Sequence, residues 1–234
     1  MSESHLDVGD EVRRGIAQVQ ERIAAACARA GRDPSEVTLV GVSKFQPDPM
    51  VRAAVDAGLL DLAENYAQAM RDRVEAMPDL PVRWHQIGPL QRNKAGIVAR
   101  IAAYFHALDS PAIADALGTR RDPATPLHVF VQVNIAGETT KSGVDPADVP
   151  DLIAAVQQHP SLRVAGLMGM PPLAERPEDS REHFAALREL GLRLGVPGLS
   201  LGTTDDFEVA VEEGATMVRV GRSIFGSRHG RPGR

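Results

Sequence analysis

The sequence predicts an α/β fold, a single (β/α)8 barrel with one additional helix at its amino-terminal end. Short apolar segments, typical of buried strands, alternate along the chain with segments whose apolar residues recur at helical spacing. Eight such strands occur, and eight parallel strands joined by crossover helices close into a barrel filled by its own side chains. An open doubly wound sheet is the alternative, but no G-x-G-x-x-G follows the first expected strand.

The expected elements start with the additional helix, residues 8–30, which ends at Gly31 as helices commonly do. The first strand, 38–44, is a short apolar run after a Pro-Ser-Glu turn. Seven further strands are expected at 61–65, 83–88, 104–109, 127–134, 163–170, 199–204 and 217–226. Helices are expected between them at 50–58, 66–77, 93–102, 113–117, 148–159, 177–194 and 206–213.

Composition bounds the domain organisation and the partners. The chain has 234 residues, 43% of them hydrophobic, so it is long enough to bury a sizeable core. Its net charge of -5 argues against nucleic acid as the main partner. No linker divides it, so 1–234 should form one domain, with 1–31 as the amino-terminal helix and 227–234 as a disordered tail. It carries neither a signal peptide's apolar stretch nor the roughly 20 apolar residues of a membrane span, which predicts a cytoplasmic protein with no membrane partner.

The cysteine and histidine positions do not form the spacings typical of a metal site. Cys27, the only cysteine, excludes disulfides within the chain, and its place in AAACARA indicates a core residue on a helix. No H-x-x-x-H or Glu-x-x-His pair supports a metal ion. His85, His106 and His128 fall inside expected strands, where core positions are favoured over catalytic ones.

Lysine is rare among the cations. The 26 Lys plus Arg include only three lysines, Lys44, Lys94 and Lys141, so each is a candidate for chemistry that guanidinium cannot perform. Lys44 directly follows the first strand, and in these barrels the working residues sit at the carboxyl ends of strands. Partial burial there lowers the pKa of an amine and frees it to attack a carbonyl, so we expect Lys44 to form a Schiff base. The alternative for Lys44 is a solvent-exposed surface lysine. For Lys94 and Lys141 two roles are equally consistent with the sequence: a solvated lysine in a loop or at a helix start, or a contact with the cofactor or with a protein that exchanges it.

Glycines and hydroxyls follow the last two expected strands. LGTTDD places Thr203 and Thr204 after the seventh strand, and VRVGRS places Gly221 and Arg222 after the eighth. Loops at these positions commonly hold phosphate through backbone N–H groups and hydroxyls. With Lys44 across the same barrel mouth, the pattern fits a ligand that carries an aldehyde and a phosphate. Pyridoxal 5'-phosphate (PLP) is such a ligand, and a sugar phosphate held by a lysine-dependent aldolase is the alternative.

Seven separated blocks carry a resemblance that covers nearly the whole chain. They are LVGVSKFQP, AENYAQ, WHQIGPLQRNK, FHALDS, VQVNIAGETTKSGV, GLMGM and LSLGTTDDFEVAVEEGATMVRVGRSIFGSR. In these blocks the chain resembles the YggS/PROSC family of pyridoxal-phosphate homeostasis proteins. The resemblance implies the barrel of the alanine racemase-like fold, fold type III of PLP-dependent proteins, without the carboxyl-terminal β domain of the racemases. It also implies that PLP is bound covalently on Lys44.

The resemblance further implies the other cofactor contacts. It assigns phosphate contacts to Thr204 and to the backbone of Gly221 and Arg222, places Asn65 beside the cofactor, and directs Arg219 to the pyridine nitrogen. The family commonly has Met-Ser where Thr203 and Thr204 stand, and Thr in place of Arg222. Thr204 therefore keeps the hydroxyl group of the family's serine, whereas Arg222 adds a positive charge. From the residues themselves, Met168 is expected in the core with one face against the ring.

Arginine at the pyridine nitrogen argues against strong catalysis. PLP enzymes that stabilise carbanions strongly place a carboxylate at the pyridine nitrogen, and Arg219 would leave the ring a weaker electron sink. An interior ion pair is the alternative role for Arg219. We therefore expect a PLP homeostasis protein and not an enzyme, with transient contacts to PLP-dependent apoenzymes; the resemblance favours a monomer. An amino-acid racemase, in which Tyr66 is a candidate second base, and a Schiff-base aldolase are the alternatives.

Overall fold

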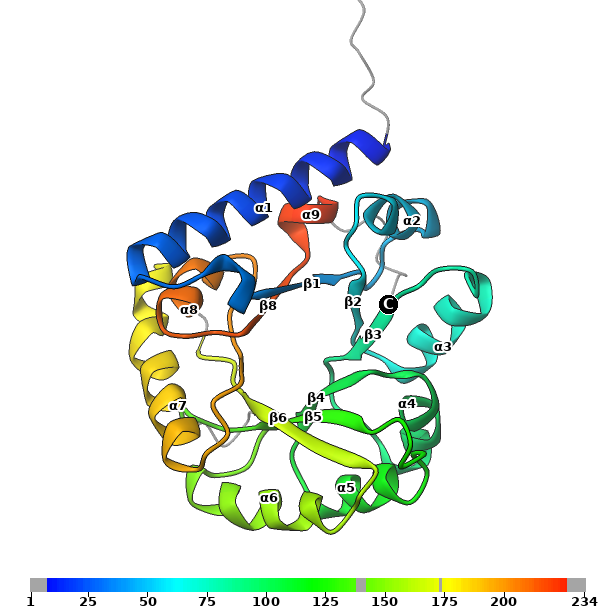
Figure 1. The fold of residues 1–234 in the computed structure, drawn as a ribbon, viewed down its shortest axis with the longest axis vertical. Helices are drawn as coiled ribbons and strands as arrows, with labels where there is room; N and C mark the ends of the chain where they lie inside the picture. Colours follow the sequence, from blue (N-terminus) through cyan, green and yellow to red (C-terminus); the bar gives the residue numbers. More distant parts are fainter. Residues whose placement is uncertain (1–7, 138–141, 173, 227–234) are drawn as a thin grey trace, which may run out of the picture.

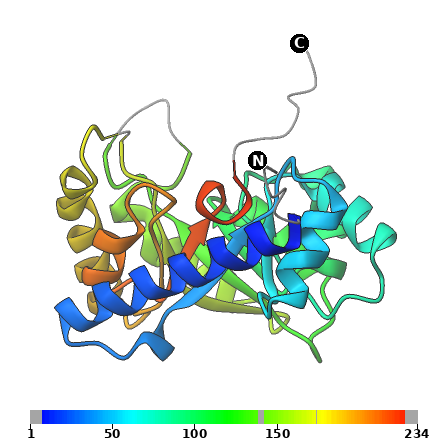
Figure 2. The same cartoon turned by 90° about the horizontal axis from the view of Figure 1, so that it is seen from above.

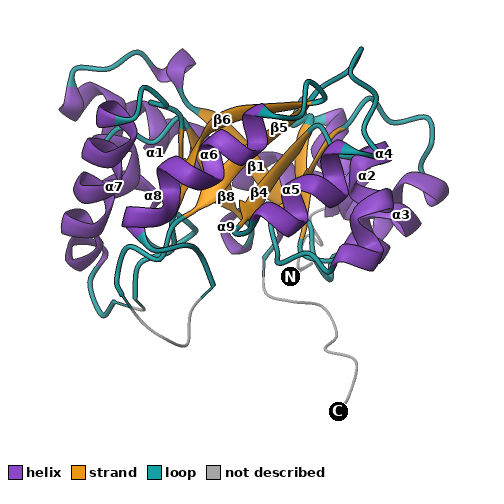
Figure 3. Ribbon diagram, turned by 90° about the horizontal axis from the view of Figure 1, so that it is seen from below, coloured by secondary structure: helices purple, strands orange, loops and turns teal. Residues whose placement is uncertain are grey.

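The computed structural model describes residues 8–137, 142–172 and 174–226. Eight parallel strands close into a barrel in which each strand pairs with its neighbours in sequence and β8 pairs with β1 (Figure 1). The helices lie outside this ring of strands (Figure 3). The predicted (β/α)8 barrel is confirmed. The expected tail at 227–234 and Lys141 lie outside the described residues.

The strands are short and the helices cover them. The strands are β1 Thr38–Val42, β2 Asp61–Glu64, β3 Arg83–Gln86, β4 Tyr104–Leu108, β5 Leu127–Gln132, β6 Leu162–Met168, β7 Leu199–Ser200 and β8 Met217–Val220. The helices are α1 Val8–Ala30, α2 Asp48–Asp56, α3 Ala67–Ala76, α4 Ala95–Ile101, α5 Pro111–Gly118, α6 Val149–Gln157, α7 Arg181–Arg193, α8 Phe207–Glu212 and α9 Arg222–Phe225. Single helical turns lie at η1 Pro34–Glu36, η2 Arg92–Lys94, η3 Pro146–Asp148 and η4 Pro177–Ser180.

The prediction of one strand over 217–226 is wrong in its second half. Strand β8 ends at Val220, and the next residues form the short helix α9. The backbone leaves the extended conformation at Gly221, with φ -118° and ψ -71°, and the helical turn ends at Gly226, with φ 76°. A short apolar run does not distinguish a buried strand from a buried helical turn, and Ile224 and Phe225 are buried in either case.

The alternation of side chains along the strands determines what faces the barrel interior. His106 on β4 is hydrogen-bonded to Ser200 on β7, and since these strands are not neighbours, both side chains point inward. Arg219 on β8 contacts Ser200 and is in register with Val40 on β1. Register partners in a parallel pair point to the same face, so Val40 and Val42 face the barrel interior. Lys44 lies two residues beyond Val42, in the turn past the carboxyl end of β1.

Helix α1 is the additional helix, and it packs along the outside of the barrel against α2, α8 and α9 (Figures 1 and 2). The approach to α9 is close, because a Cβ atom on Gly15 would lie 2.6 Å from the carbonyl oxygen of Ser223. Cys27 on the same helix is fully buried in the core, as predicted. Arg22 and Arg29 pair with carboxylates of α8. None of the helices in the described residues is long and apolar enough to cross a membrane.

Candidate cofactor site at the carboxyl ends of the strands

Lys44 lies at the carboxyl end of β1, in the turn that leads to α2. Its side chain is half-buried, and the preceding backbone N–H, of Ser43, donates a 3.0 Å hydrogen bond to the carbonyl oxygen of Ala63 on β2. The next residue, Phe45, has φ 64°, a left-handed conformation that is strained for an aromatic residue. The lysine therefore sits in a constrained turn at the barrel mouth, the position predicted for it.

A buried carboxylate supports this turn from the outside of the strands. Glu64, at the end of β2, is 2% exposed and accepts a 2.9 Å hydrogen bond from the hydroxyl of Ser43. Arg73 of α3 donates to Glu64 at 3.4 Å and also bonds the carbonyl oxygen of Gln46. Burial raises the pKa of Glu64, against the opposing effects of Ser43, Arg73 and Lys44. The turn before and after Lys44 is thus tied to β2 and α3.

Asn65 directly follows β2, on the neighbouring strand to Lys44. Its backbone carbonyl accepts a 2.8 Å hydrogen bond from the side-chain amide of Gln86, which fixes this exit from the barrel. Its own side chain is half-buried, two residues beyond the inward-facing Ala63. Tyr66 is 57% exposed at the rim, so it lies outside the barrel interior.

The loops after β7 and β8 meet at the side chain of Thr204. The hydroxyl oxygen of Thr204 accepts a 3.3 Å hydrogen bond from the backbone N–H of Gly221. Thr203 instead donates to the carboxylate of Asp206, from its backbone N–H at 2.7 Å and from its hydroxyl at 3.1 Å. The side chain of Arg222 points away and pairs with Asp205, with both side chains more than 60% exposed. Of the residues predicted for a phosphate site, Thr204 and the backbone at the start of α9 are therefore the ones that meet.

Arg219 is a buried cation close to the carboxyl end of β8. One guanidinium nitrogen donates to the carbonyl oxygen of Ser200 at 2.7 Å and to its hydroxyl, and another donates to the carbonyl oxygen of Gly169 at 3.5 Å. Burial lowers the pKa of Arg219 to about 10, while the charge of Asp206 opposes this shift. Among the described residues its contacts are oxygens of hydroxyl and carbonyl groups, so the alternative of an interior ion pair finds no partner there.

The eight predicted site residues gather at one end of the barrel. Met168 is 1% exposed and is in register with the inward-facing Ser200, so it faces the interior as expected. The set follows five consecutive strands around the ring, in the order β2, β1, β8, β7 and β6. Its members are Lys44, Asn65, Met168, Thr203, Thr204, Arg219, Gly221 and Arg222. Lys94 is half-buried and ends η2, in the segment that follows the carboxyl end of β3.

Sequence reasoning missed a set of buried polar residues inside the barrel. Asp61, His85, His106 and Ser200 are joined by hydrogen bonds of 2.7 to 3.0 Å. The strand prediction placed both histidines correctly but gave them no partners. The available signal was a polar side chain recurring at inward positions of strands that are otherwise apolar.

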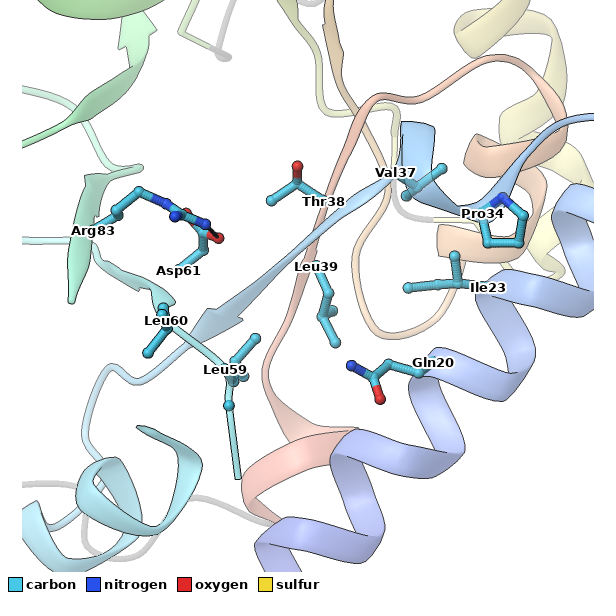
Figure 4. A pocket seen from close by; sticks show the side chains of 11 residues that line it. Gln20, Ile23, Pro34, Val37, Thr38, Leu39, Leu59, Leu60, Asp61 and Arg83 are labelled. Atoms are coloured by element: carbon cyan, nitrogen blue, oxygen red, sulfur yellow. Dashed lines mark hydrogen bonds and ion pairs between the residues drawn. The ribbon is translucent and has the colours of Figure 1, made fainter. Parts of the chain in front are cut away.

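A cavity of about 340 Å³ lies at the opposite, amino-terminal end of the strands (Figure 4). It is lined by α1, by η1 and by the first residues of three strands, Thr38, Asp61 and Arg83. The side chains of Asp61 and Arg83 point toward one another there and form an ion pair. Because Lys44 follows the other end of β1, this cavity is separate from the candidate cofactor site.

The residues at the mouth fit the chemical parts of PLP. Lys44 supplies an amine, Thr204 and the N–H groups after β8 supply donors for a phosphate, and Arg219 supplies a buried donor that carries a positive charge. No group of three or more His, Cys, Asp or Glu side chains within the described ranges is arranged to hold a metal ion.

Comparisons with known proteins identify similar chains along most of the sequence. A family model described as alanine racemase, N-terminal domain, matches residues 48–229. The pyridoxal phosphate homeostasis protein of Pseudomonas aeruginosa is 46% identical over 223 residues, which cover 93% of this chain and 96% of that protein. The solved structure of PipY from Synechococcus elongatus with PLP bound has a TM-score of 0.75 and 31% identity, covering 89% of this chain and 100% of that chain.

A more distant structure shares the fold. Alanine racemase from Corynebacterium glutamicum has a TM-score of 0.69 at 14% identity, and the match covers 96% of this chain but 63% of that chain. The barrel is therefore common to both groups, while the high identity is found with the homeostasis proteins. The chain belongs to the pyridoxal phosphate homeostasis protein family, whose barrel is an alanine racemase N-terminal domain.

Proposed function

We propose that this protein binds PLP reversibly as a Schiff base on Lys44, contributes to PLP homeostasis by storing and supplying the cofactor, and has no strong catalytic activity of its own. The observation that carries the proposal is the grouping of Lys44, Thr204, Gly221 and Arg219 at the carboxyl ends of adjacent strands. The PLP found in PipY and the names of the curated relatives support it.

Each residue has a separate task in this proposal. The aldehyde of PLP supplies the reactive carbon, to which Nζ of Lys44 bonds as one water leaves. The hydroxyl of Thr204, which accepts a hydrogen bond from the N–H of Gly221, donates its own proton to the phosphate. The backbone N–H groups of Gly221 and Arg222 complete the phosphate site at the start of a helical turn, with the Gly221 N–H exchanging Thr204 for a phosphate oxygen. Asn65 and Met168 border the ring.

Arg219 supports a carrier in preference to an enzyme. Its pKa of about 10 leaves the guanidinium protonated at neutral pH, so it can donate to the pyridine nitrogen but cannot take a proton from it. A ring nitrogen that stays unprotonated withdraws electrons weakly, which disfavours carbanion chemistry. Tyr66, the candidate second base of a racemase, is 57% exposed at the rim.

The rim of the mouth offers apolar surface for a recipient protein. Phe45, Tyr66 and Met170 follow β1, β2 and β6 and are 43%, 57% and 53% exposed. We propose that a monomer of this protein uses this rim for transient contacts with PLP-dependent apoenzymes. We place this activity in the cytoplasm, since a chain with a single cysteine suits a reducing compartment.

The visible spectrum of the purified protein tests the proposal. Wild-type protein titrated with PLP should develop the absorption band of the bound cofactor, and borohydride reduction should attach one PLP to the peptide that contains Lys44. Lys44→Ala should lose both signals, while the control Lys94→Ala should keep them. Absence of uptake by wild-type protein, or attachment at Lys94, would overturn the assignment. Amino-acid racemisation at ordinary enzyme rates that disappears in Lys44→Ala would instead favour the racemase.

A further inference from the structure

A chain of five polar side chains crosses the barrel interior beneath the proposed cofactor site. It starts at Asp61, whose Oδ1 lies 3.0 Å from Nε2 of His85. Nδ1 of His85 lies 2.9 Å from Nε2 of His106, and Nδ1 of His106 lies 2.7 Å from the hydroxyl of Ser200. Arg219 donates to the same hydroxyl. All five side chains are buried.

The Asp61 end of this chain, together with neutral imidazoles, determines the direction of its hydrogen bonds. A carboxylate only accepts, so His85 donates from Nε2 to Asp61. A neutral ring has one acceptor nitrogen, so Nδ1 of His85 accepts from Nε2 of His106, and Nδ1 of His106 accepts from the hydroxyl of Ser200. Arg219 only donates, so the oxygen of that hydroxyl accepts from the guanidinium. All four bonds therefore point from Arg219 toward Asp61.

The ionisation of these groups agrees with that order. Burial lowers the pKa of both His85 and His106, so the imidazoles are neutral. Burial acts to raise the pKa of Asp61, but hydrogen bonds from His85 and Arg83 outweigh it and lower the pKa to about 2. The chain thus joins Arg219 through three neutral dipoles to Asp61, an anion that also pairs directly with Arg83. The acceptor atom of each dipole faces the cation, an orientation that stabilises a buried positive charge.

Aromatic rings hold the imidazoles in place. Tyr104 stacks on His85 with ring centroids 4.6 Å apart, and Phe130 lies 4.8 Å from His106. The Asp61 end of the chain lines the cavity at the amino-terminal end of the barrel (Figure 4). The Arg219 end lies two residues before Gly221 of the proposed phosphate site. The chain therefore extends from one end of the barrel interior to the other.

We infer that Ser200, His106 and His85 are positioning residues, which hold the Arg219 guanidinium in place beneath the cofactor and connect it to Asp61 as its remote counter-ion. This inference rests on the proposed function, in which Arg219 meets the pyridine nitrogen. Arg219 has no carboxylate contact among the described residues, so removal of the chain leaves a buried cation supported by carbonyl oxygens alone.

The first test uses protein without cofactor. Nitrogen-15 NMR of the histidine side chains should show both His85 and His106 as neutral rings protonated on Nε2. Ser200→Ala should shift the Nδ1 resonance of His106, which loses its hydrogen-bond donor. His128→Gln is the matched control, because His128 is in register with Tyr104 on the neighbouring strand but lies outside the chain. A protonated ring, or a proton on Nδ1 of either histidine, would refute the proposed order.

The second test uses PLP labelled with nitrogen-15 at the ring. Wild-type protein should show an unprotonated pyridine nitrogen hydrogen-bonded to a cation. Ser200→Ala and Asp61→Asn should each shift that resonance and raise the Kd for PLP by about tenfold, the effect of losing one charge-assisted hydrogen bond. Asp61→Asn keeps an acceptor oxygen for His85 but removes both the charge and the direct ion pair with Arg83. Arg83→Gln, which breaks that pair and keeps the charge of Asp61, should have a smaller effect on both values. His128→Gln should leave both values unchanged.

The two proposals fail in different ways. If wild-type protein takes up no PLP, the proposed function fails, while the NMR of the ligand-free histidines still decides the order of the chain. If wild-type protein binds PLP but Ser200→Ala and Asp61→Asn bind it with the wild-type Kd and the wild-type ring resonance, the positioning role is refuted and the proposed function stands. Circular dichroism of each variant establishes that the barrel is folded.

Discussion

The carboxylate of Glu64 accepts a 2.9 Å hydrogen bond from the hydroxyl of Ser43, the residue directly before Lys44. Glu64 ends β2 and Ser43 follows β1, so this bond joins two neighbouring strands at the point where the lysine enters the barrel mouth. Arg73 supplies the nearby positive charge that a buried carboxylate requires. The position of Lys44 therefore depends on side chains that do not face the cofactor site.

Removing Arg73 should loosen this support. Arg73→Ala leaves Glu64 buried without its guanidinium, and breaking a buried pair typically costs about 3–5 kcal/mol of stability. We expect a lower free energy of unfolding in urea and a Kd for PLP raised by about tenfold, since the turn around Lys44 becomes less ordered. The control is Arg71→Ala on the same helix, which removes an exposed pair with Asp72. Equal behaviour of the two variants would contradict the supporting role.

Asp61 should contribute stability that disappears in acid. Its pKa is about 2 in the folded protein, below its ordinary value of 3.8. At a pH above 3.8, ionised Asp61 therefore stabilises the folded state by about 2 kcal/mol. This contribution is lost as the pH falls through about 4 to about 2. Asp61→Asn should therefore be less stable than wild type at pH 7 and approach it near pH 2, as measured by urea unfolding. The exposed Asp72→Asn should follow the wild-type curve; a constant difference for Asp61→Asn would disprove the assignment.

Gly15 should not tolerate a side chain. An added Cβ would lie 2.6 Å from the carbonyl oxygen of Ser223 and 2.7 Å from that of Ile224, both backbone atoms of α9. Gly15→Ala should lower the free energy of unfolding by about 2 kcal/mol through overpacking and raise the Kd for PLP, because α9 carries the N–H groups of the proposed phosphate site. Gly96→Ala is the matched control on α4, where the new Cβ makes an ordinary 3.6 Å contact with Arg120. It should be neutral or stabilising by up to about 1 kcal/mol.

Substitutions of the two neighbouring threonines should have different effects: Thr203 stabilises its loop, whereas Thr204 contacts the phosphate in the proposed function. Thr204→Val removes the hydroxyl beside Gly221 and should raise the Kd for PLP by about tenfold while leaving the binding of pyridoxal, which has no phosphate, unchanged. Thr203→Val removes a hydrogen bond to Asp206 at the start of α8 and should cost about 1 kcal/mol of stability with a smaller effect on Kd. Parallel titrations with PLP and pyridoxal measure the difference. A reversed pattern would move the phosphate contact to Thr203.

Strand-forming segments and the mouth residues could be predicted because both follow from local pattern. An apolar run that ends in Ser-Lys locates a strand and the residue at its carboxyl end, and the fold then groups Lys44 with Gly221. Helix α9 could not be distinguished, because its apolar residues are too few to show a period. The outward direction of Arg222 depends on its exposed partner Asp205, which strand alternation does not reveal.

The hydrogen-bonded chain inside the barrel was beyond prediction for a different reason. Its histidines are 21 residues apart, and His106 lies 94 residues from Ser200. A partner at such separation is determined by how the barrel closes and by the shear of its strands, and no local period carries that information. The inward polar positions of β2, β3, β4 and β7 become meaningful only when all are placed in one interior.

The pairing of β8 with β1 has a consequence for the order of synthesis. Lys44 leaves the ribosome well before β8 and Gly221, and these segments become neighbours only when the ring closes. In the proposed function, a nascent chain that stops before Met217 has the amine of Lys44 without the phosphate donors that follow β8. We therefore expect stable uptake of PLP only after β8 has been added, so that a chain that holds the cofactor is one whose barrel is closed.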